Sequence, residues 1–134
     1  MLIAELLARA ISVASLGTRP VSEVVRDVAE DAGRAIGERV VSHLPTGASR
    51  EQRIDALFEV LVGEGFEPRL LDSHIALANC PFHVLAGEFT ELVCGMNQQV
   101  LDGLVRAIGD DFADSRLEPE SGFCCVRICL RETT

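Results

Sequence analysis

The sequence predicts an α+β domain in which helices pack on one antiparallel sheet, with two β-hairpins that flank a long helix and build that sheet. Apolar residues recur at helical spacing in the first half of the chain. In the second half they alternate in two pairs of short segments and return to helical spacing between those pairs. Because 134 residues suffice for one core but not for two, we expect a single domain. Its helical part spans about residues 1–65, and its hairpin–helix–hairpin part spans about residues 66–134.

The first two helices are separated by Gly17 and Pro20, which break the helical pattern. The first helix begins at the start of the chain and is apolar along one stripe, which makes it a candidate dimerisation element. The second should run from about Pro20 to Ser42, with Thr18 as the candidate N-cap. Small residues along it should let a neighbouring helix approach closely. Its expected buried stripe consists of Val21, Val24, Val25, Val28, Ala32 and Ile36.

The third helix has a start and an end that can be read from the sequence. Ser49 and Gln52 match a capping box, in which each side chain bonds the backbone of the other residue. Gly63 and Gly65 stand where glycines commonly end a helix. The expected apolar face consists of Ile54, Leu57, Phe58, Leu61 and Val62.

The second half of the chain predicts two hairpins with one helix between them. The turn of the first hairpin is Asp72–Ser73, and the turn of the second lies around residues 119–122. A proline cannot donate to a sheet ladder, so the second strand should end before Pro81. The expected elements are strands Phe66–Leu71 and His74–Asn79, the helix Thr90–Ile108, and strands Ala113–Glu118 and Phe123–Leu130.

Composition narrows the range of functions. The net charge is −9, and all twelve basic residues are arginine, so the chain on its own lacks the basic surface that nucleic-acid binding needs. No apolar window is long enough to span a bilayer, and the start of the chain has no basic segment typical of a signal peptide. We therefore expect a cytoplasmic protein. The consecutive Asp72, Ser73 and His74 are turn residues, and no acid–base constellation predicts an enzyme.

The cysteines are the residues with the clearest chemistry. Cys80 ends a predicted strand, Cys94 lies in the first turns of the long helix, and Cys124 shares a strand face with Val126. These three should meet near one end of the sheet. With His83 they would form a Cys3His set that suits tetrahedral zinc, and without it three thiolates would suit an iron–sulfur cluster. The alternative is that they are buried thiols that pack as small hydrophobic groups.

Two stretches carry a resemblance to a known family. NCPFHVLAGEFTELVCGMNQQVLDGLVRAIG and RLEPESGFCCVRI resemble the C-terminal sensor domain of bacterial winged-helix transcriptional regulators of the Suf-operon repressor type, especially in their actinobacterial branch. The upstream AELLARAI and GFEPRLLDSHIALANCPF also fit that pattern, so the resemblance covers nearly the whole chain. The domain is also similar to the vinyl-reductase-like ligand-binding domain.

The resemblance implies a role for named residues. The Suf-operon repressor senses an iron–sulfur cluster through three cysteines, which Cys80, Cys94 and Cys124 match in order and approximately in spacing. His83 belongs to the motif of this branch and makes zinc the other expected metal. Members of the family bind DNA as dimers through an N-terminal winged-helix domain. This chain has no such segment, so a truncated or domain-only form and a homodimer are implied. Cys125 and Cys129 are assigned no role.

Two other functions are also compatible with the sequence. The first is a metal-free domain that binds a small-molecule effector in an apolar cavity between the sheet and the helices, and that also dimerises. The second is a plain oligomerisation module with a well-packed interior and no bound ion. Both functions agree with the α+β prediction. The positions of the cysteines and of any groove therefore decide between a metal site, an effector cavity and an oligomerisation module.

Overall fold

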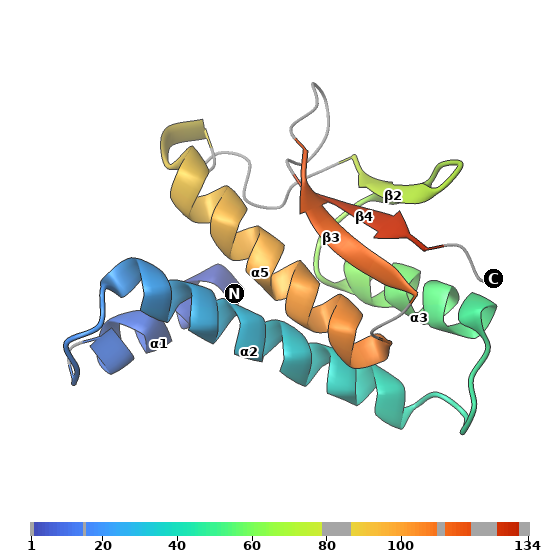
Figure 1. Cartoon of the computed structure of the whole chain (residues 1–134), viewed down its shortest axis with the longest axis horizontal. Coiled ribbons are helices and arrows are strands. Elements are labelled where there is room, and N and C mark those ends of the chain that lie inside the picture. Colours follow the sequence, from blue (N-terminus) through green and yellow to red (C-terminus); the bar gives the residue numbers. More distant parts are fainter. Residues whose placement is uncertain (1, 15, 79–86, 110–111, 119–125, 132–134) are drawn as a thin grey trace.

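The computed structural model describes residues 2–14, 16–78, 87–109, 112–118 and 126–131, and it confirms the α+β class. Figure 1 shows α5 lying between α2 and the sheet, with α1 packed on α2. The predicted order of three helices, a hairpin, a long helix and a second strand pair is confirmed. The elements are α1 (Leu2–Ala14), α2 (Val21–Ser42), α3 (Arg50–Gly63), β1 (Pro68–Leu70), β2 (His74–Leu77), α5 (Thr90–Ile108), β3 (Ala113–Leu117) and β4 (Val126–Leu130).

The four strands form one antiparallel sheet in the order β1-β2-β4-β3. Ile75 is paired with Leu70 on one side and with Ile128 on the other, so the central β2–β4 pair joins the two strand pairs into a single sheet. Side chains of a strand alternate between the two faces. One face is therefore apolar and points toward the helices, and its fully buried members are Ile75, Leu77, Val126 and Ile128.

Two apolar clusters hold the layers together. The larger lies between the sheet, α3 and the second half of α5, and it includes Leu57, Leu61 and Leu104. The smaller lies where α1, α2 and the first half of α5 meet, and it consists of Leu6, Ala10, Val24, Val25, Ala29, Met96 and Val100. Burying each leucine, valine or methionine side chain of these clusters stabilises the fold by about 1.5–3 kcal/mol relative to exposure. The two halves of α5 thus belong to different clusters.

Glycines allow α2 and α5 to approach closely, as the small residues of α2 predicted. A Cβ placed on Gly33 would overlap the carbonyl oxygen of Val100, and one on Gly103 would overlap the carbonyl oxygen of Glu30. A Cβ on Gly37 would meet Leu104 and the side chain of Ala107 in the same way. Backbone-to-backbone contact of this kind leaves no room for any side chain at these positions.

The ends of α3 match their sequence signals. Ser49 Oγ accepts from the backbone N–H of Gln52 at 3.1 Å, and Gln52 Oε1 accepts from the backbone N–H of Ser49 at 2.8 Å. At the other end, Phe66 N donates to the Leu61 carbonyl and Gly65 N donates to the Val62 carbonyl. This is a Schellman motif, and Gly65 supplies the positive φ of 96° that it needs.

Other details of the prediction are wrong. Thr18 is not the N-cap of α2, because Pro20 occupies that position and its carbonyl accepts from Glu23 N and Val24 N. Val21 and Val62 were expected in buried stripes but are 56% and 61% exposed. Val21 is the first residue of α2 and Val62 is the next-to-last residue of α3, where the packing partner no longer covers the stripe.

The first strand is shorter than predicted because its beginning is still part of a helix end. Phe66 donates its N–H to the Leu61 carbonyl at 3.0 Å, so it closes α3 and does not start a strand. The predicted turn at Asp72–Ser73 is confirmed, since Leu71 N bonds the His74 carbonyl across it. Within the described ranges, no helix combines the length and apolar composition required to cross a membrane.

Candidate functional site

Cys94 lies in the second turn of α5 and is buried, with only 6% of its surface exposed. Seven and eleven residues later, Leu101 and Val105 continue the same stripe, because these spacings return to one face of a helix. Leu101 and Val105 pack in the sheet-side cluster, so the stripe that carries Cys94 faces the sheet. Among the residues that the structure describes, Cys94 belongs to neither apolar cluster. It stands about 10 Å along the helix from Leu101, toward the N-terminal end of α5.

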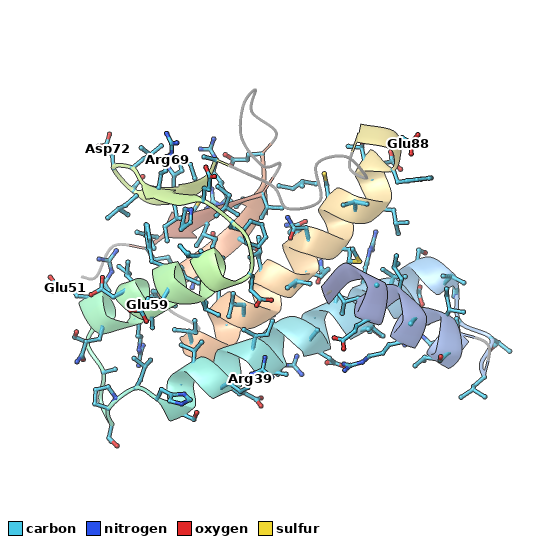
Figure 2. The ribbon with its side chains drawn as sticks, turned by 180° about the vertical axis from the view of Figure 1, so that it is seen from behind. Arg39, Glu51, Glu59, Arg69, Asp72 and Glu88 are labelled. Carbon is cyan, nitrogen blue, oxygen red and sulfur yellow. The ribbon has the colours of Figure 1, made fainter. Side chains whose placement is uncertain are left out.

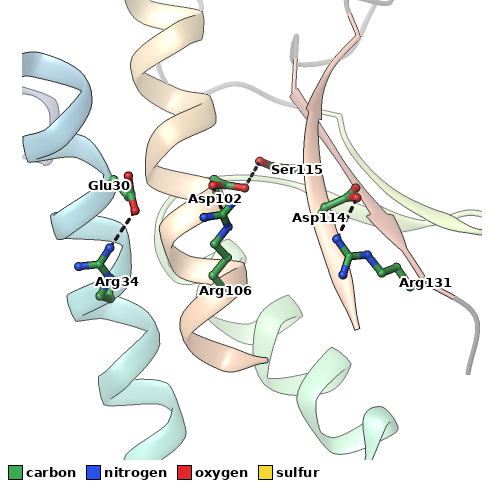
Figure 3. A network of polar contacts seen from close by, with 7 residues as sticks. All are labelled: Glu30, Arg34, Asp102, Arg106, Asp114, Ser115 and Arg131. Carbon is green, nitrogen blue, oxygen red and sulfur yellow. Dashed lines mark hydrogen bonds and ion pairs between the residues drawn. The ribbon is translucent and has the colours of Figure 1, made fainter. Parts of the chain in front are cut away.

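The direction of α5 relative to the sheet is fixed by a contact with β3. Ser115 Oγ donates to Asp102 Oδ1 at 3.2 Å, as Figure 3 shows. The chain then passes from Ile108 at the end of α5 to Ala113 at the start of β3, so the two elements run in opposite directions. The N-terminal half of α5, with Cys94, consequently extends toward the end of the sheet where β3 finishes.

The other predicted ligands, Cys80, His83 and Cys124, lie outside the described residues, as does Cys125. Their described neighbours in the sequence are Ala78 and Val126. Because β2 and β4 are antiparallel neighbours, the end of β2 and the start of β4 lie at the same end of the sheet. This is also the end toward which the first half of α5 extends. The two segments that contain the predicted ligands thus join the described fold near the end that carries Cys94.

Asn97 is a residue of this region that sequence reasoning missed. It lies one turn after Cys94, and its side chain is 3% exposed, which makes it the buried polar residue of the described chain. A buried amide is costly unless it is hydrogen-bonded, so such residues usually mark a position where a polar partner is needed. The available signal was a polar residue inside the apolar stripe of α5, between Met96 and Val100.

Cys129 is separated from Cys94 by the sheet. It pairs in register with His74 on β2 and with Asp114 on β3, so it lies on the face away from α5. Burial raises the pKa of the Cys129 thiol. Arg116 lowers that pKa and Asp114 raises it, both by smaller amounts. The thiol is therefore protonated at neutral pH. In the part of the chain that the structure describes, no three or more His, Cys, Asp or Glu side chains gather closely enough to hold a metal ion.

A groove of about 300 Å³ lies between α1, α2 and the end of α3. Leu6, Ala32 and Ile36 form its apolar floor, and the charged side chains at its rim are Glu5, Arg9, Arg39 and Glu64. Figure 2 labels Arg39 on α2. A cavity of this size reaches the lower limit for small-molecule sites. The effector cavity was expected between the sheet and the helices, whereas the lining of this groove comes from α1, α2 and Glu64 at the end of α3 and includes no described residue of the sheet.

Several other charged residues form ion pairs on the surface. Arg34 bonds Glu30 at 2.8 Å within α2, Arg106 pairs with Asp102 at 3.2 Å within α5, and Arg131 approaches Asp114 at 3.4 Å (Figure 3). The arginine of each pair is at least half exposed. Exposed pairs of this kind contribute at most about 1 kcal/mol each to the free energy of unfolding.

Comparison with known proteins adds no assignment: no protein-family model matches the chain, and no match was found among curated proteins or solved structures.

Proposed function

We propose that this chain is the sensor domain of a bacterial winged-helix transcriptional regulator and holds a zinc ion or an iron–sulfur cluster. Cys80, Cys94 and Cys124 are its proposed ligands, with His83 as the fourth ligand of zinc. The observation that supports this most directly is Cys94: a buried thiol on the sheet-facing stripe of α5, outside both apolar clusters. The end of the sheet toward which it extends is also where the segments bearing Cys80 and Cys124 begin.

The donor set fits the proposed groups chemically. Thiolates are soft ligands that favour zinc and iron–sulfur clusters over magnesium or calcium. A bound group would supply cross-links between the start of α5 and both hairpins. Within the chain itself, the sheet-facing stripe of α5 orients Cys94.

A route from this site to the rest of the domain runs through the smaller apolar cluster. Met96 and Val100, just after Cys94 on α5, pack in one cluster with Leu6 and Ala10 of α1. Gly33 of α2 lies against the Val100 backbone, and Gly103 of α5 lies against the Glu30 backbone. These two contacts hold α2 and α5 at a fixed separation. Loosening the start of α5 would therefore alter the support of α1. A regulator needs such a coupling between its ligand and its quaternary arrangement.

The proposed partners rest on the charge and on the family resemblance. With a net charge of −9, the domain would contact DNA only through a separate winged-helix domain. As the resemblance implies, we propose a homodimer, which would act in the cytoplasm without catalysing a reaction. The second candidate function is a metal-free effector domain. The groove beside α1 supports it, since a floor of Leu6 and Ile36 with a rim of arginine and glutamate suits a small amphipathic molecule.

The test is an analysis of iron, sulfide and zinc together with a visible absorption spectrum, on protein purified without oxygen. We expect stoichiometric zinc, or iron with sulfide and a broad visible band. Cys94→Ser should abolish binding, whereas Cys129→Ser, the matched control on the other face of the sheet, should retain it. Metal-free wild-type protein of undiminished stability would contradict the proposal and favour the effector domain.

A further inference from the structure

We propose that two copies of this chain pair through α1, with the two helices antiparallel. The contact surface is the α1 stripe, which we define as Ala4, Leu7, Ala8 and Ile11. These positions follow helical spacing and lie beside the face on which Leu6 and Ala10 pack against α2. Ile11 is 65% exposed, Ala4 and Ala8 are exposed, and Leu7 is half-buried.

The charge distribution favours a second copy as the partner. Glu5 and Arg9 are the charged residues of α1, and both line the groove against α2, so the α1 stripe carries no charge. Two copies of a chain with a net charge of −9 repel each other, and they approach at least cost where a surface is uncharged. A lipid surface is a poorer fit, because helices that lie on membranes carry several basic residues on their polar face.

The order of residue sizes selects the antiparallel arrangement. Small and large side chains alternate along the stripe. Its four positions are spaced symmetrically about the point between Leu7 and Ala8, so that each small side chain has a large one at the mirrored position. Reversing one copy therefore places Ile11 opposite the partner's Ala4 and Leu7 opposite the partner's Ala8, so each large side chain meets a small one. A parallel pair would set Ile11 against Ile11 and leave a gap between the two Ala4 residues.

This pairing deepens the homodimer of the proposed function by naming its surface, and its test does not depend on a bound metal. The failure of one is thus distinguishable from the failure of the other. A metal-free dimer would refute the sensor and keep the α1 pairing, and a metal-bound monomer would do the reverse.

The first experiment measures the mass of the full chain by sedimentation over a concentration series. We expect Ile11→Glu to raise the dimer dissociation constant by about tenfold or more, because it buries a charge against a small side chain. Val62→Glu is the matched control, since Val62 on α3 is 61% exposed and lies outside the stripe. Circular dichroism confirms that both variants fold. A wild-type monomer at all concentrations, or equal effects of both variants, would overturn the pairing.

Cysteine cross-linking tests the direction of the pair and needs no loss of stability. A disulfide requires Cα atoms within about 7 Å, which antiparallel symmetry allows for Ala8→Cys next to the axis. The same symmetry separates residue 4 from its own mate, and residue 11 from its mate, by about 10 Å. We expect Ala8→Cys to form an 8–8 linked peptide detectable by mass spectrometry. Ala4→Cys and Ile11→Cys should cross-link only when mixed. Equal cross-linking at all three positions would indicate a parallel pair and refute the proposal.

Discussion

Two cysteines of the same chain differ because of where the fold puts them. Cys94 is buried on the sheet-facing stripe of α5, near Asn97, whereas Cys129 lies on the opposite face of the sheet beside Asp114. In the strand predicted over Phe123–Leu130, successive side chains point to opposite faces, which puts Cys129 with Arg127 on one face and Val126 with Ile128 on the other. Both placements are confirmed by burial. Residue chemistry alone, a thiol in each case, does not separate a candidate ligand from a spare side chain.

The raised pKa of Cys129 gives a pH dependence of stability. The folded state holds the thiol proton to higher pH than the unfolded state does. This thiol's contribution to the free energy of unfolding is therefore complete below the ordinary thiol pKa of 9.0, and it declines as the pH rises through the folded-state pKa. Urea unfolding between about pH 7.5 and 10.5 should show a steeper loss of stability for the wild type than for Cys129→Ala. Parallel pH profiles of the two proteins would show that burial does not affect this thiol.

At the scale of the element, the N-cap of α3 provides a local test. The Ser49 side chain accepts a bond from Gln52 N, which lacks a partner within the helix. Ser49→Ala should lower the free energy of unfolding by about 1 kcal/mol, measured by urea denaturation. Ser42→Ala is a suitable control, because Ser42 ends α2 and its hydroxyl bonds the Arg39 carbonyl without capping an N-terminus. Equal losses in the two variants would argue against the capping box.

The contact of α2 with α5 makes a second element-scale prediction. In Gly33→Ala the new methyl group would overlap the Val100 carbonyl, which belongs to a helix backbone and cannot rotate away. We expect a loss of about 1–3 kcal/mol in the free energy of unfolding. Gly63→Ala is the matched control: nothing lies near its Cβ position, and alanine favours helix by up to about 1 kcal/mol. Unchanged stability of Gly33→Ala would mean that the two helices are farther apart than described.

Elements with strong patterns could be predicted from the sequence, and contacts between elements could not. The helix Thr90–Ile108 was predicted with its observed bounds because its apolar stripe is continuous, and Ser49 carried its own capping signal. Val21 and Val62 fit their helical patterns equally well, yet both are exposed, since burial at a helix end depends on how far the neighbour reaches. The partner of the α2 glycines, and the order of strands in the sheet, depend on the same long-range packing.

At the scale of the molecule, α5 connects the two apolar clusters. Its second half packs on the sheet through Leu104 and its neighbours, and its first half packs on α1 and α2 through Met96 and Val100. Cys94 stands at the start of that first half. Only this ligand of the proposed set lies among the described residues, so the gathering of the cysteines near one end of the sheet stays a prediction. The burial of Asn97 was not predicted, because a single polar residue does not interrupt an apolar stripe.

The measurement that tests the central claim most directly is amide hydrogen exchange of the metal-loaded protein before and after removal of the metal by a chelator. The account predicts faster exchange in the first half of α5 and in α1 once the metal is gone, because both share the cluster that follows Cys94. Exchange in α3, which packs in the other cluster, should stay the same. Unchanged exchange in α5 and α1 would contradict a sensor that works through Cys94.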